Sequence, residues 1–438
     1  MDVSYVFAGL VVASRDQAAS WYARLLGRPA DMLPNDAEAT WQLTSATSVY
    51  LLADADRAGH GVLSLVVDDL QAQLAQITAR GIVTGPVEEI PGAGRKCAIT
   101  DPDGNTVSIV QLLAAQRRSD GLPRYDALPR AERGGRSGWG LFGSLDSVGL
   151  LNLQTAERVL AAARLVKKGA VFPLDAAIDA VDPPLAASRG LPRHRVLHQP
   201  GPGLTGLDDV YDNFYPQASS QWDSLAHIAY APGVFYNGAT DDDVLSGRRN
   251  TIDHWARRGI AGRAIVLDLD RALNADGQTY SPADGTAFSV SQLEVARAHA
   301  GVSYSPGCIV LLRTGFLGWY RDQPRRTRIA LASSLRAPGV EHTEEMARYL
   351  WDNEIMAVAS DTFAVEVWPP DFSSESFPFG FLHRVLIGQF GMALGELWWL
   401  DDLAADCERD GVYECLLTSA PLHANGGIGS PPNALAMK

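Results

Sequence analysis

The sequence has little cysteine and few cations, and both deficits exclude classes of protein. It contains four cysteines in 438 residues, and none forms a Cys-x-x-Cys pair. Such sparse cysteine excludes a disulfide framework and favours a reducing, cytoplasmic setting. Lys and Arg number 37 against 51 Asp and Glu, for a formal net charge of −14. This deficit argues against nucleic acid as a partner.

Long hydrophobic runs and a leader pattern are also missing. No stretch approaches ~18 uninterrupted apolar residues, so no membrane span and no membrane partner are expected. The first residues carry no basic region followed by a small-residue cleavage site, which argues against a secretory signal. Because a single hydrophobic core rarely grows beyond roughly 250–300 residues, the length predicts two domains.

The first domain is predicted over residues 1–113, where strand-like and helix-like segments alternate. Apolar residues at helical spacing predict that one face of a helix over 15–26 is buried; they are Ala18, Trp21, Tyr22 and Leu25. A second helix is predicted at 70–80, and strands at 5–12, 41–43, 48–53, 62–67, 97–100 and 106–112. A Pro- and Gly-containing turn at 101–105 joins the last two strands. The order indicates a β-α-β-β-β unit used twice.

Residues 114–137 lose this periodicity and gain Arg, Pro and Gly, which predicts a linker. The second domain, 138–438, holds eight of the ten tryptophans and eight of the nine histidines. Helices are predicted at 155–168, 243–258, 290–300 and 344–353, and buried strands at 264–269, 308–313 and 355–359. The whole chain is therefore expected to be α+β or α/β, with an α/β second domain.

Three groups of residues in the second domain point to chemistry. Asp223 and His227 are four residues apart, so they could bind a divalent cation together or form a carboxylate-oriented general base. His383 and Glu396 flank a largely apolar segment, where burial is costly unless each is paired or metal-bound. His254 lies on a predicted helix. Surface ion pairing, capping of exposed ends and packing against a tryptophan are the respective structural alternatives.

The first domain resembles the vicinal oxygen chelate family, which includes glyoxalases and bleomycin-resistance proteins. The resemblance is carried by LVVASRDQAASWYARLLG, LVVDDLQAQLAQITARG and DPDGNTVSIVQ. The family's four metal positions fall near Phe7, Ala53 and Val62 and at Ser108, none of which is His, Glu or Gln. The resemblance therefore implies a domain without a metal or other cofactor. Such a domain could bind a small aromatic molecule, brace the second domain or mediate dimerisation.

From residue 137 onward the chain resembles the cyclase family of kynurenine formamidases and isatin hydrolase. The carriers are Gln221-Trp222-Asp223 with His227, together with Trp139-Gly140, Tyr236-Asn237-Gly238, Leu312-Arg313-Thr314-Gly315 and Gly429-Ser430-Pro431-Pro432-Asn433. This resemblance implies a swivelling β/β/α fold, a small-molecule substrate and a homo-oligomer. The fusion of the two domains suggests specialised metabolism.

The resemblance also assigns roles to particular residues. The family's two early histidine ligands fall at Gln217 and Gln221, its shared aspartate at Asp223 and its acid/base histidine at His227. The late histidine and glutamate ligands fall at His383 and Glu396, and the glutamate also assists the acid/base histidine. Since an amide is a poorer ligand than imidazole, a dinuclear zinc site is not expected. One divalent ion, zinc or manganese, held by Asp223, His383 and Glu396 with Gln221 or His254 is one outcome, and a metal-free site is the other.

The leading hypothesis is a metal-dependent hydrolase that opens or cleaves an aromatic or cyclic amide, lactam or lactone. The alternative is a metal-independent cyclase, dehydratase or isomerase acting on an aromatic or polyketide-like compound through His227 and Asp223. A degenerate binding module is a third hypothesis. Substrate-binding candidates are Trp222, Tyr236 and Trp368 as apolar lining and Arg313 as a carboxylate anchor. Core packing for the three aromatic residues and a structural ion pair for Arg313 remain open.

Overall fold

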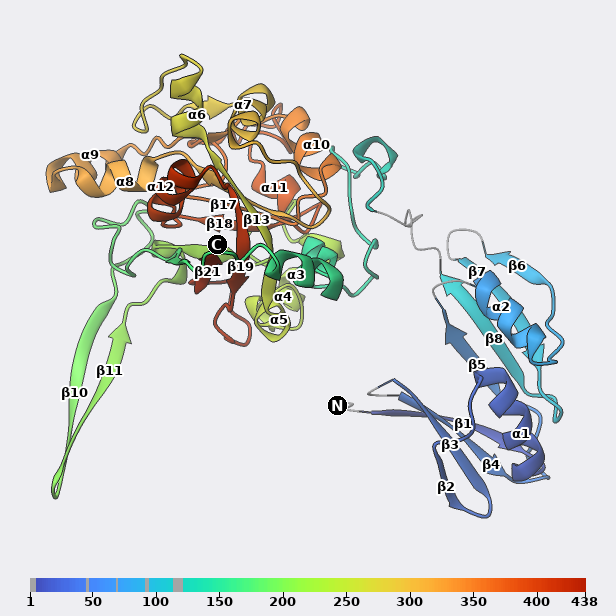
Figure 1. Cartoon of the computed structure of the whole chain (residues 1–438). Helices are drawn as coiled ribbons and strands as arrows, with labels where there is room; N and C mark the ends of the chain where they lie inside the picture. The colour runs from blue at the N-terminus through green and yellow to red at the C-terminus, as the bar shows by residue number, and fades with distance from the viewer. Residues whose placement is uncertain (1–4, 45–46, 68–69, 91–93, 113–120) are drawn as a thin grey trace. The chain divides into compact units, whose positions relative to one another are not determined.

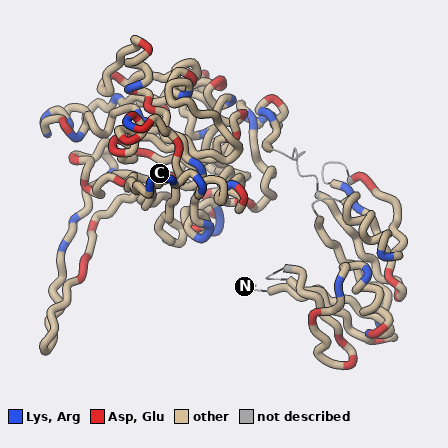
Figure 2. Tube along the Cα trace, viewed as in Figure 1, with Lys and Arg blue, Asp and Glu red and all other residues tan. Residues whose placement is uncertain are grey.

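The computed structural model describes residues 5–44, 47–67, 70–90, 94–112 and 121–438 (Figure 1). The chain divides into two compact units, residues 1–116 and 117–438, and each has a hydrophobic core. Among the described residues, no helix is both long and apolar enough to cross a membrane. Acidic and basic residues are interspersed along both units (Figure 2).

The N-terminal unit contains two sheets with the same topology, which confirms the repeated β-α-β-β-β pattern. The first repeat comprises β1 (Val6–Val12), α1 (Arg15–Leu26), β2 (Met32–Asn35), β3 (Glu38–Thr44) and β4 (Thr47–Ala53). The second comprises β5 (Val62–Val66), α2 (Leu70–Ala79), β6 (Val87–Ile90), β7 (Gly94–Thr100) and β8 (Thr106–Leu112). The strand orders are β1-β4-β3-β2 and β5-β8-β7-β6. In each repeat the first strand pairs in parallel with the last.

Local sequence explains how these elements form and join. The predicted face of α1 is buried, and the helix ends at Gly27, whose φ of 77° suits a left-handed cap. At the turn between β7 and β8, Asp101 Oδ1 accepts hydrogen bonds from the backbone N–H groups of Asp103 and Asn105. Tyr22 donates to the other oxygen of Asp101 at 2.9 Å, so this turn is tied to α1.

The residues at the family's four metal positions lie on or beside four different strands. Phe7 is in β1, Ala53 ends β4, Val62 begins β5 and Ser108 is in β8. Phe7 and Val62 are exposed. His60, in the loop before β5, is also exposed. That this unit holds no metal stays a prediction from these residue types.

The C-terminal unit is built on one mixed sheet with strand order β20-β12-β18-β17-β15-β13-β19-β21-β9. Its strands are β9 (Val171–Pro173), β12 (Gln221–Asp223), β13 (Ile260–Asp268), β15 (Ile309–Arg313), β17 (Ala357–Ser360), β18 (Ala393–Glu396), β19 (Glu414–Ser419), β20 (Gly429–Ser430) and β21 (Ala434–Met437). The four strands β13, β15, β17 and β18 are parallel to one another. The remaining pairings in this sheet are antiparallel.

Helices surround this sheet, and a separate pair of short strands lies beside them. The helices are α3 (Ala156–Ala163), α4 (Asp241–Leu245), α5 (Ile252–Arg258), α6 (Leu269–Ala275), α7 (Val290–Ala300), α8 (Phe316–Asp322), α9 (Arg325–Ser333), α10 (Glu344–Asp352), α11 (His383–Leu386) and α12 (Asp401–Asp410). The short strands are β14 (Ala287–Phe288) and β16 (Gly339–Val340). Every residue of β15 and β17 is buried, because helices cover both faces of a largely parallel sheet. The expected mixture of helices and strands, with an α/β second domain, is thus confirmed.

Two predicted segments differ from the structure. The predicted helix over 243–258 is two helices, α4 and α5, because Gly247 and Asn250 adopt positive φ angles between them. The predicted linker belongs with the C-terminal unit over its described part, since Leu122 and Tyr125 are buried in that unit's core. Tyr125 donates through its hydroxyl to Glu344 at 2.9 Å. Residues 114–120 of the predicted linker lie outside the described residues.

One hairpin projects from the C-terminal unit as a long two-stranded arm (Figure 1). It consists of β10 (Arg193–Gly201) and β11 (Leu204–Asp212), which pair only with each other among the described strands. Every residue of β10 is exposed. We call residues 193–212 the arm.

Candidate active site

The sheet register places Gln221 and Asp223 on one face of β12. In the pairing with β18, Gln221 lies opposite Glu396 and Trp222 lies opposite Gly395. Because side chains alternate along a strand, Trp222 points to the other face. Gln221 donates from its side-chain amide to Glu396 Oε2, as expected for a direct cross-strand pair. Strand pairing therefore assembles one side of the site from segments far apart in sequence.

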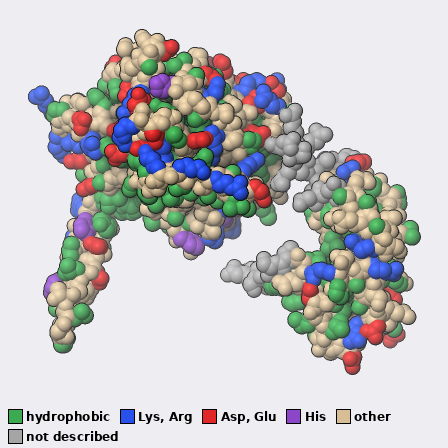
Figure 3. Space-filling model, viewed as in Figure 1, with side chains coloured by type: hydrophobic (Ala, Val, Ile, Leu, Met, Phe, Trp, Pro, Cys, Tyr) green, Lys and Arg blue, Asp and Glu red, His purple; other side chains and the backbone are tan. Residues whose placement is uncertain are grey.

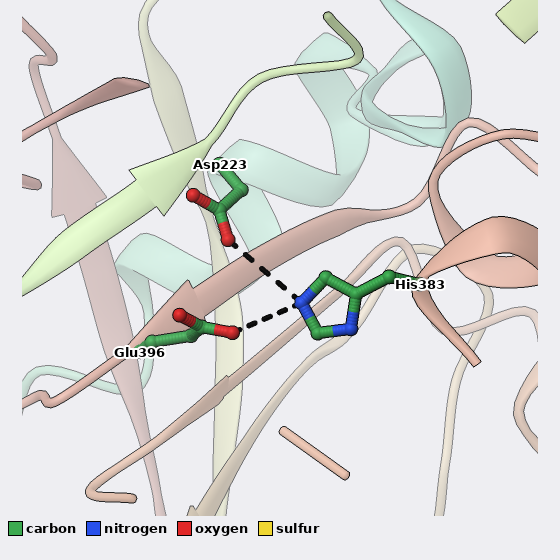
Figure 4. Close-up of side chains that lie close together, drawn as sticks. All are labelled: Asp223, His383 and Glu396. Carbon is green, nitrogen blue, oxygen red and sulfur yellow. Dashed lines mark hydrogen bonds and ion pairs between the residues drawn. The ribbon is translucent and has the colours of Figure 1, made fainter. Parts of the chain in front are cut away.

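His383 completes a buried cluster with Asp223 and Glu396 (Figure 4). Its Nε2 lies 3.0 Å from Glu396 Oε1 and 3.9 Å from Asp223 Oδ2. One potential ligand atom from each of the three residues lies within 4.8 Å of the others. We call these three residues the acidic cluster.

Asp223 is fully buried, and neither of its carboxylate oxygens has a hydrogen-bond partner among the described residues. Burial and the nearby Glu396 raise the pKa of Asp223 well above its usual range, and the charges of His383 and Arg189 oppose that rise. Gln221 Oε1 is likewise buried and unpartnered. Oxygen atoms left in this state carry a large desolvation cost unless a cation or proton satisfies them.

The donor set of the acidic cluster fits a divalent metal ion. Two carboxylates and one imidazole are ligands that zinc, manganese and iron accept in proteins. The buried oxygens of Asp223 and Gln221, which have no hydrogen-bond partner among the described residues, supply further lone pairs. A cation there would also neutralise two carboxylates that otherwise repel each other.

Glu366 fixes the orientation of His383. Its carboxylate accepts hydrogen bonds from the backbone N–H groups of Leu382 and His383, and His383 Nδ1 bonds to the same group. This leaves Nε2 facing Asp223 and Glu396. Burial by itself lowers the pKa of His383, but the hydrogen bonds to Glu366 and Glu396 outweigh it and raise the pKa to about 10.

A second histidine supports Glu366 from the other side. His342 Nε2 lies 2.9 Å from Glu366 Oε2. Burial tends to raise the pKa of Glu366, yet His342 and His383 together lower it to about 2. Glu366 is therefore an anion held between two imidazoles. Sequence reasoning missed both Glu366 and His342, although a lone Glu in the short apolar run 363–367 was a possible signal.

His227 lies beside the acidic cluster. Its Nε2 is 3.7 Å from Asp223 Oδ1, and its side chain keeps 21% of its exposure. Burial, together with the charges of His383 and Arg189, lowers the pKa of His227 to about 3. The ring is therefore neutral near pH 7 and can accept a proton.

His254 is not brought into the acidic cluster. It lies on α5, where its Nδ1 is 3.3 Å from Arg257 Nη2. Its pKa is lowered chiefly by burial, and Asp253 opposes that effect. Because His254 lies on α5 beside Arg257 and outside the acidic cluster, its position does not support the suggested metal role.

Two aromatic candidates for substrate binding lie in the core instead. Trp222 packs edge-on against Trp398 at 4.7 Å and donates to Ser419 Oγ at 2.9 Å. Gly395 leaves room for this packing, since a Cβ there would lie 2.7 Å from Trp398 Nε1. Tyr236 is fully buried and donates to Asp146 at 3.0 Å. Strand alternation and core burial explain why these two rings do not line a site.

Arg313 is engaged in a structural ion-pair network. Its guanidinium lies 2.8 Å from Asp268, 3.2 Å from Asp270 and 2.7 Å from Asp401. Burial alone would lower the pKa of Arg313, but the surrounding aspartates outweigh it and raise the pKa. The ion-pair alternative therefore describes Arg313, and the carboxylate-anchor role does not.

Trp368 lies in an aromatic group that reaches the acidic cluster. Its ring is 4.8 Å from Phe363 and 6.5 Å from Phe381. Phe381 stacks on His383 at 4.8 Å with an interplanar angle of 13°. Of the three aromatic candidates, Trp368 is thus the one connected to the cluster.

Comparison with known proteins relates the C-terminal unit to a family. Residues 172–367 match the family model described as "Putative cyclase". The crystal structure described as a novel cyclase is 28% identical, covers 69% of this chain and 99% of its own, and has a TM-score of 0.61. The C-terminal unit is therefore similar to this cyclase family. The similarity supports an enzyme, consistent with a buried cluster of ionisable groups.

The N-terminal unit has relatives of its own. A glyoxalase/bleomycin resistance protein from Catenulispora acidiphila is 33% identical, covering 24% of this chain and 96% of that protein, with a TM-score of 0.24. The similarity to this protein extends over nearly the whole of that protein's length.

A further solved structure aligns with the cyclase-family unit. Isatin hydrolase A from Labrenzia aggregata is 17% identical, covering 65% of this chain and 98% of that protein, with a TM-score of 0.43. No curated protein matches the chain.

Proposed function

We propose that the cyclase-family unit is a metal-dependent hydrolase that cleaves an aromatic or cyclic amide, lactam or lactone. The observation that carries the proposal is the acidic cluster, in which a fully buried Asp223 with two unpartnered oxygens faces His383 and Glu396. Asp223, His383 and Glu396 would hold one divalent ion, with Gln221 Oε1 as an additional oxygen. Such an ion supplies Lewis-acid polarisation of a carbonyl and activation of water.

The chain's own residues would handle the proton. His227 is neutral near pH 7 because its pKa is about 3, and its Nε2 lies 3.7 Å from Asp223. It can take a proton from the attacking water and deliver it to the departing nitrogen or oxygen. The stacked Phe381 and the neighbouring Trp368 offer an apolar surface for an aromatic substrate beside the cluster.

Metal content tests this proposal directly. We expect the purified full chain to hold about one equivalent of zinc, manganese or iron, and Asp223→Asn to lose it, because the amide removes a charged ligand. Asp253→Asn is the matched control, since Asp253 is also buried but lies outside the cluster. The same metal content in all three proteins would refute the proposal, as would absence of metal after incubation with divalent ions.

A second candidate function uses the same residues without an ion. Burial raises the pKa of Asp223 while it lowers that of His227, which separates an acid from a base 3.7 Å apart. This arrangement favours a metal-independent cyclase, dehydratase or isomerase. Turnover that persists after chelation and is lost in both Asp223→Asn and His227→Gln would support this second function over hydrolysis.

The arm supports assembly into a homo-oligomer. An isolated two-stranded hairpin is marginally stable in water, and long exposed edges are association-prone. Val196 and Leu207, on the same face of the arm, are 58% and 63% exposed, and hydrophobic side chains extend along the arm (Figure 3). A second copy of the chain is the occupant we propose for this face.

Sedimentation measurements test this assembly. We expect Val196→Ser with Leu207→Ser to shift the full chain towards monomer, because the substitutions remove exposed apolar area that a partner would bury. Leu145→Ser, which changes a leucine that is 79% exposed and lies outside the arm, should have no effect. A monomeric parent chain would rule out the proposed assembly.

A further inference from the structure

An aromatic strip extends outward from the acidic cluster and ends at an exposed ring. We define the strip as Phe363, Trp368, Phe381 and Phe372. Successive ring centroids along it are 4.8, 6.5 and 5.4 Å apart. Phe381 stacks on His383 and is buried, as is Phe363, whereas Trp368 is partly exposed and Phe372 is 61% exposed. The strip therefore leads from the ligand atoms of the cluster to solvent.

Two guanidinium groups lie over this strip. The Arg189 guanidinium lies 5.9 Å from the Phe363 centroid, and that of Arg384 lies 5.7 Å from the Phe372 centroid. Among the described residues, neither arginine has a carboxylate within 4.0 Å, in contrast to the three aspartates around Arg313. In a chain with a net charge of −14, two arginines without acidic partners on one aromatic surface leave that surface locally cationic.

Arg189 is the closer of the two to the reacting groups. It donates from Nη1 to the backbone carbonyl of Gln217, four residues before Gln221. Because Arg189 is only partly buried, its remaining N–H groups can meet a ligand. A planar guanidinium is suited to bidentate recognition of a carboxylate.

We infer that the substrate is an aromatic compound bearing a carboxylate, with the ring on the aromatic strip and the carboxylate on Arg189. The inference rests on the proposed function, because it places the substrate in the same site. It replaces Arg313 by Arg189 as the residue that holds the substrate's anion. Arg384 contributes positive charge at the outer end of the strip.

Binding of 2-naphthoate to the metal-depleted full chain tests this inference without relying on turnover. In titration calorimetry, 2-naphthoate should bind at least about tenfold more tightly than the neutral 2-naphthamide, since a charge-assisted hydrogen bond to Arg189 is present only for the acid. Arg189→Gln should abolish the preference, and Arg189→Lys should retain part of it. Added salt should weaken the binding of 2-naphthoate alone.

Arg321→Gln is the matched control. Arg321 also lies over an aromatic ring, 4.1 Å from the Trp399 centroid, and it lies outside the strip. This variant should bind 2-naphthoate as the parent does. Equal affinities for the acid and the amide, an unchanged preference in Arg189→Gln, or no binding of either probe would overturn the inference.

The experiment also separates this inference from the proposed function. If 2-naphthoate binds only after a divalent ion is added, and binds equally to Arg189→Gln, its carboxylate is a metal ligand and the inference fails while the hydrolase proposal stands. If Asp223→Asn keeps its metal but Arg189→Gln loses the preference in the metal-depleted chain, the hydrolase proposal fails and the anion site stands.

Discussion

At the scale of single residues, Glu366 is a buried carboxylate that supports the site although it is not one of the proposed metal ligands. It accepts two backbone N–H groups at the start of α11 and lies between His342 and His383. In a metal-binding histidine, the group that bonds to the other ring nitrogen fixes the tautomer and the orientation of the imidazole. Glu366 is therefore a positioning residue for His383.

Glu366→Gln should weaken binding of the divalent ion by about 10- to 100-fold, because His383 loses the anion that orients it. Chelator competition on the full chain measures this affinity. Glu294→Gln changes a glutamate paired with Arg297 away from the site and should leave the affinity unchanged. Unaltered affinity in Glu366→Gln would assign Glu366 a structural role only.

His383 makes metal uptake dependent on pH. With its pKa raised to about 10, the metal-free imidazole is protonated at pH 8, and a metal ion must displace that proton. Apparent metal affinity should therefore rise as the pH increases from 7 to 9. Calorimetry at pH 8 in two buffers of different ionisation enthalpy should detect release of at least one proton, and equal heats in both buffers would contradict this expectation.

At the scale of elements, the three-residue strand β12 serves two environments. Gln221 and Asp223 face the acidic cluster, while Trp222 between them packs against Trp398 and Trp255. The pleat of a strand separates these roles, since neighbouring side chains point to opposite faces. The buried ring of Trp222 therefore anchors β12 in the core and holds Gln221 and Asp223 in place at the site.

Trp222→Ala should lower the free energy of unfolding by about 3–5 kcal/mol, because it removes a fully buried ring from the core. Metal bound per folded chain should remain unchanged, since Trp222 faces away from the cluster. Urea unfolding and metal analysis of the folded fraction measure the two effects. Loss of metal with little change in stability would show that Trp222 contributes to the site instead.

At the scale of the whole molecule, all the candidate site residues come from one unit. Residues 1–116 and 117–438 form separate compact units with separate cores. The acidic cluster, His227, Glu366 and Arg189 all lie within 117–438. The C-terminal unit therefore supplies every side chain of the acidic cluster.

A chain beginning at residue 117 should bind the divalent ion with the affinity of the full chain. The reason is that every ligand and every positioning residue identified here lies in the C-terminal unit. Chelator competition on the shortened and full chains makes the comparison, after circular dichroism has established that the shortened chain is folded. A folded shortened chain with much weaker binding would show that the N-terminal unit supports the site.

Much of the fold follows from local patterns in the sequence. Helical spacing places Ala18, Trp21, Tyr22 and Leu25 on a buried face, and apolar runs mark the central strands β15 and β17. Those features depend on backbone geometry and side-chain burial within a few residues. The break between α4 and α5 was harder to predict. It depends on positive φ angles at Gly247 and Asn250, and Asn adopts such an angle in only some of its contexts.

The composition of the site was decided by tertiary structure. Gln221 and Glu396 are 175 residues apart in sequence, and only the pairing of β12 with β18 makes them neighbours. Local sequence determined the repeated N-terminal module, the buried strands and the residue types available for chemistry. Tertiary packing alone decided that Glu366 holds His383, that Arg313 is paired and that Arg189 has no carboxylate partner among the described residues. Contacts between distant segments depend on register and burial that no local pattern encodes.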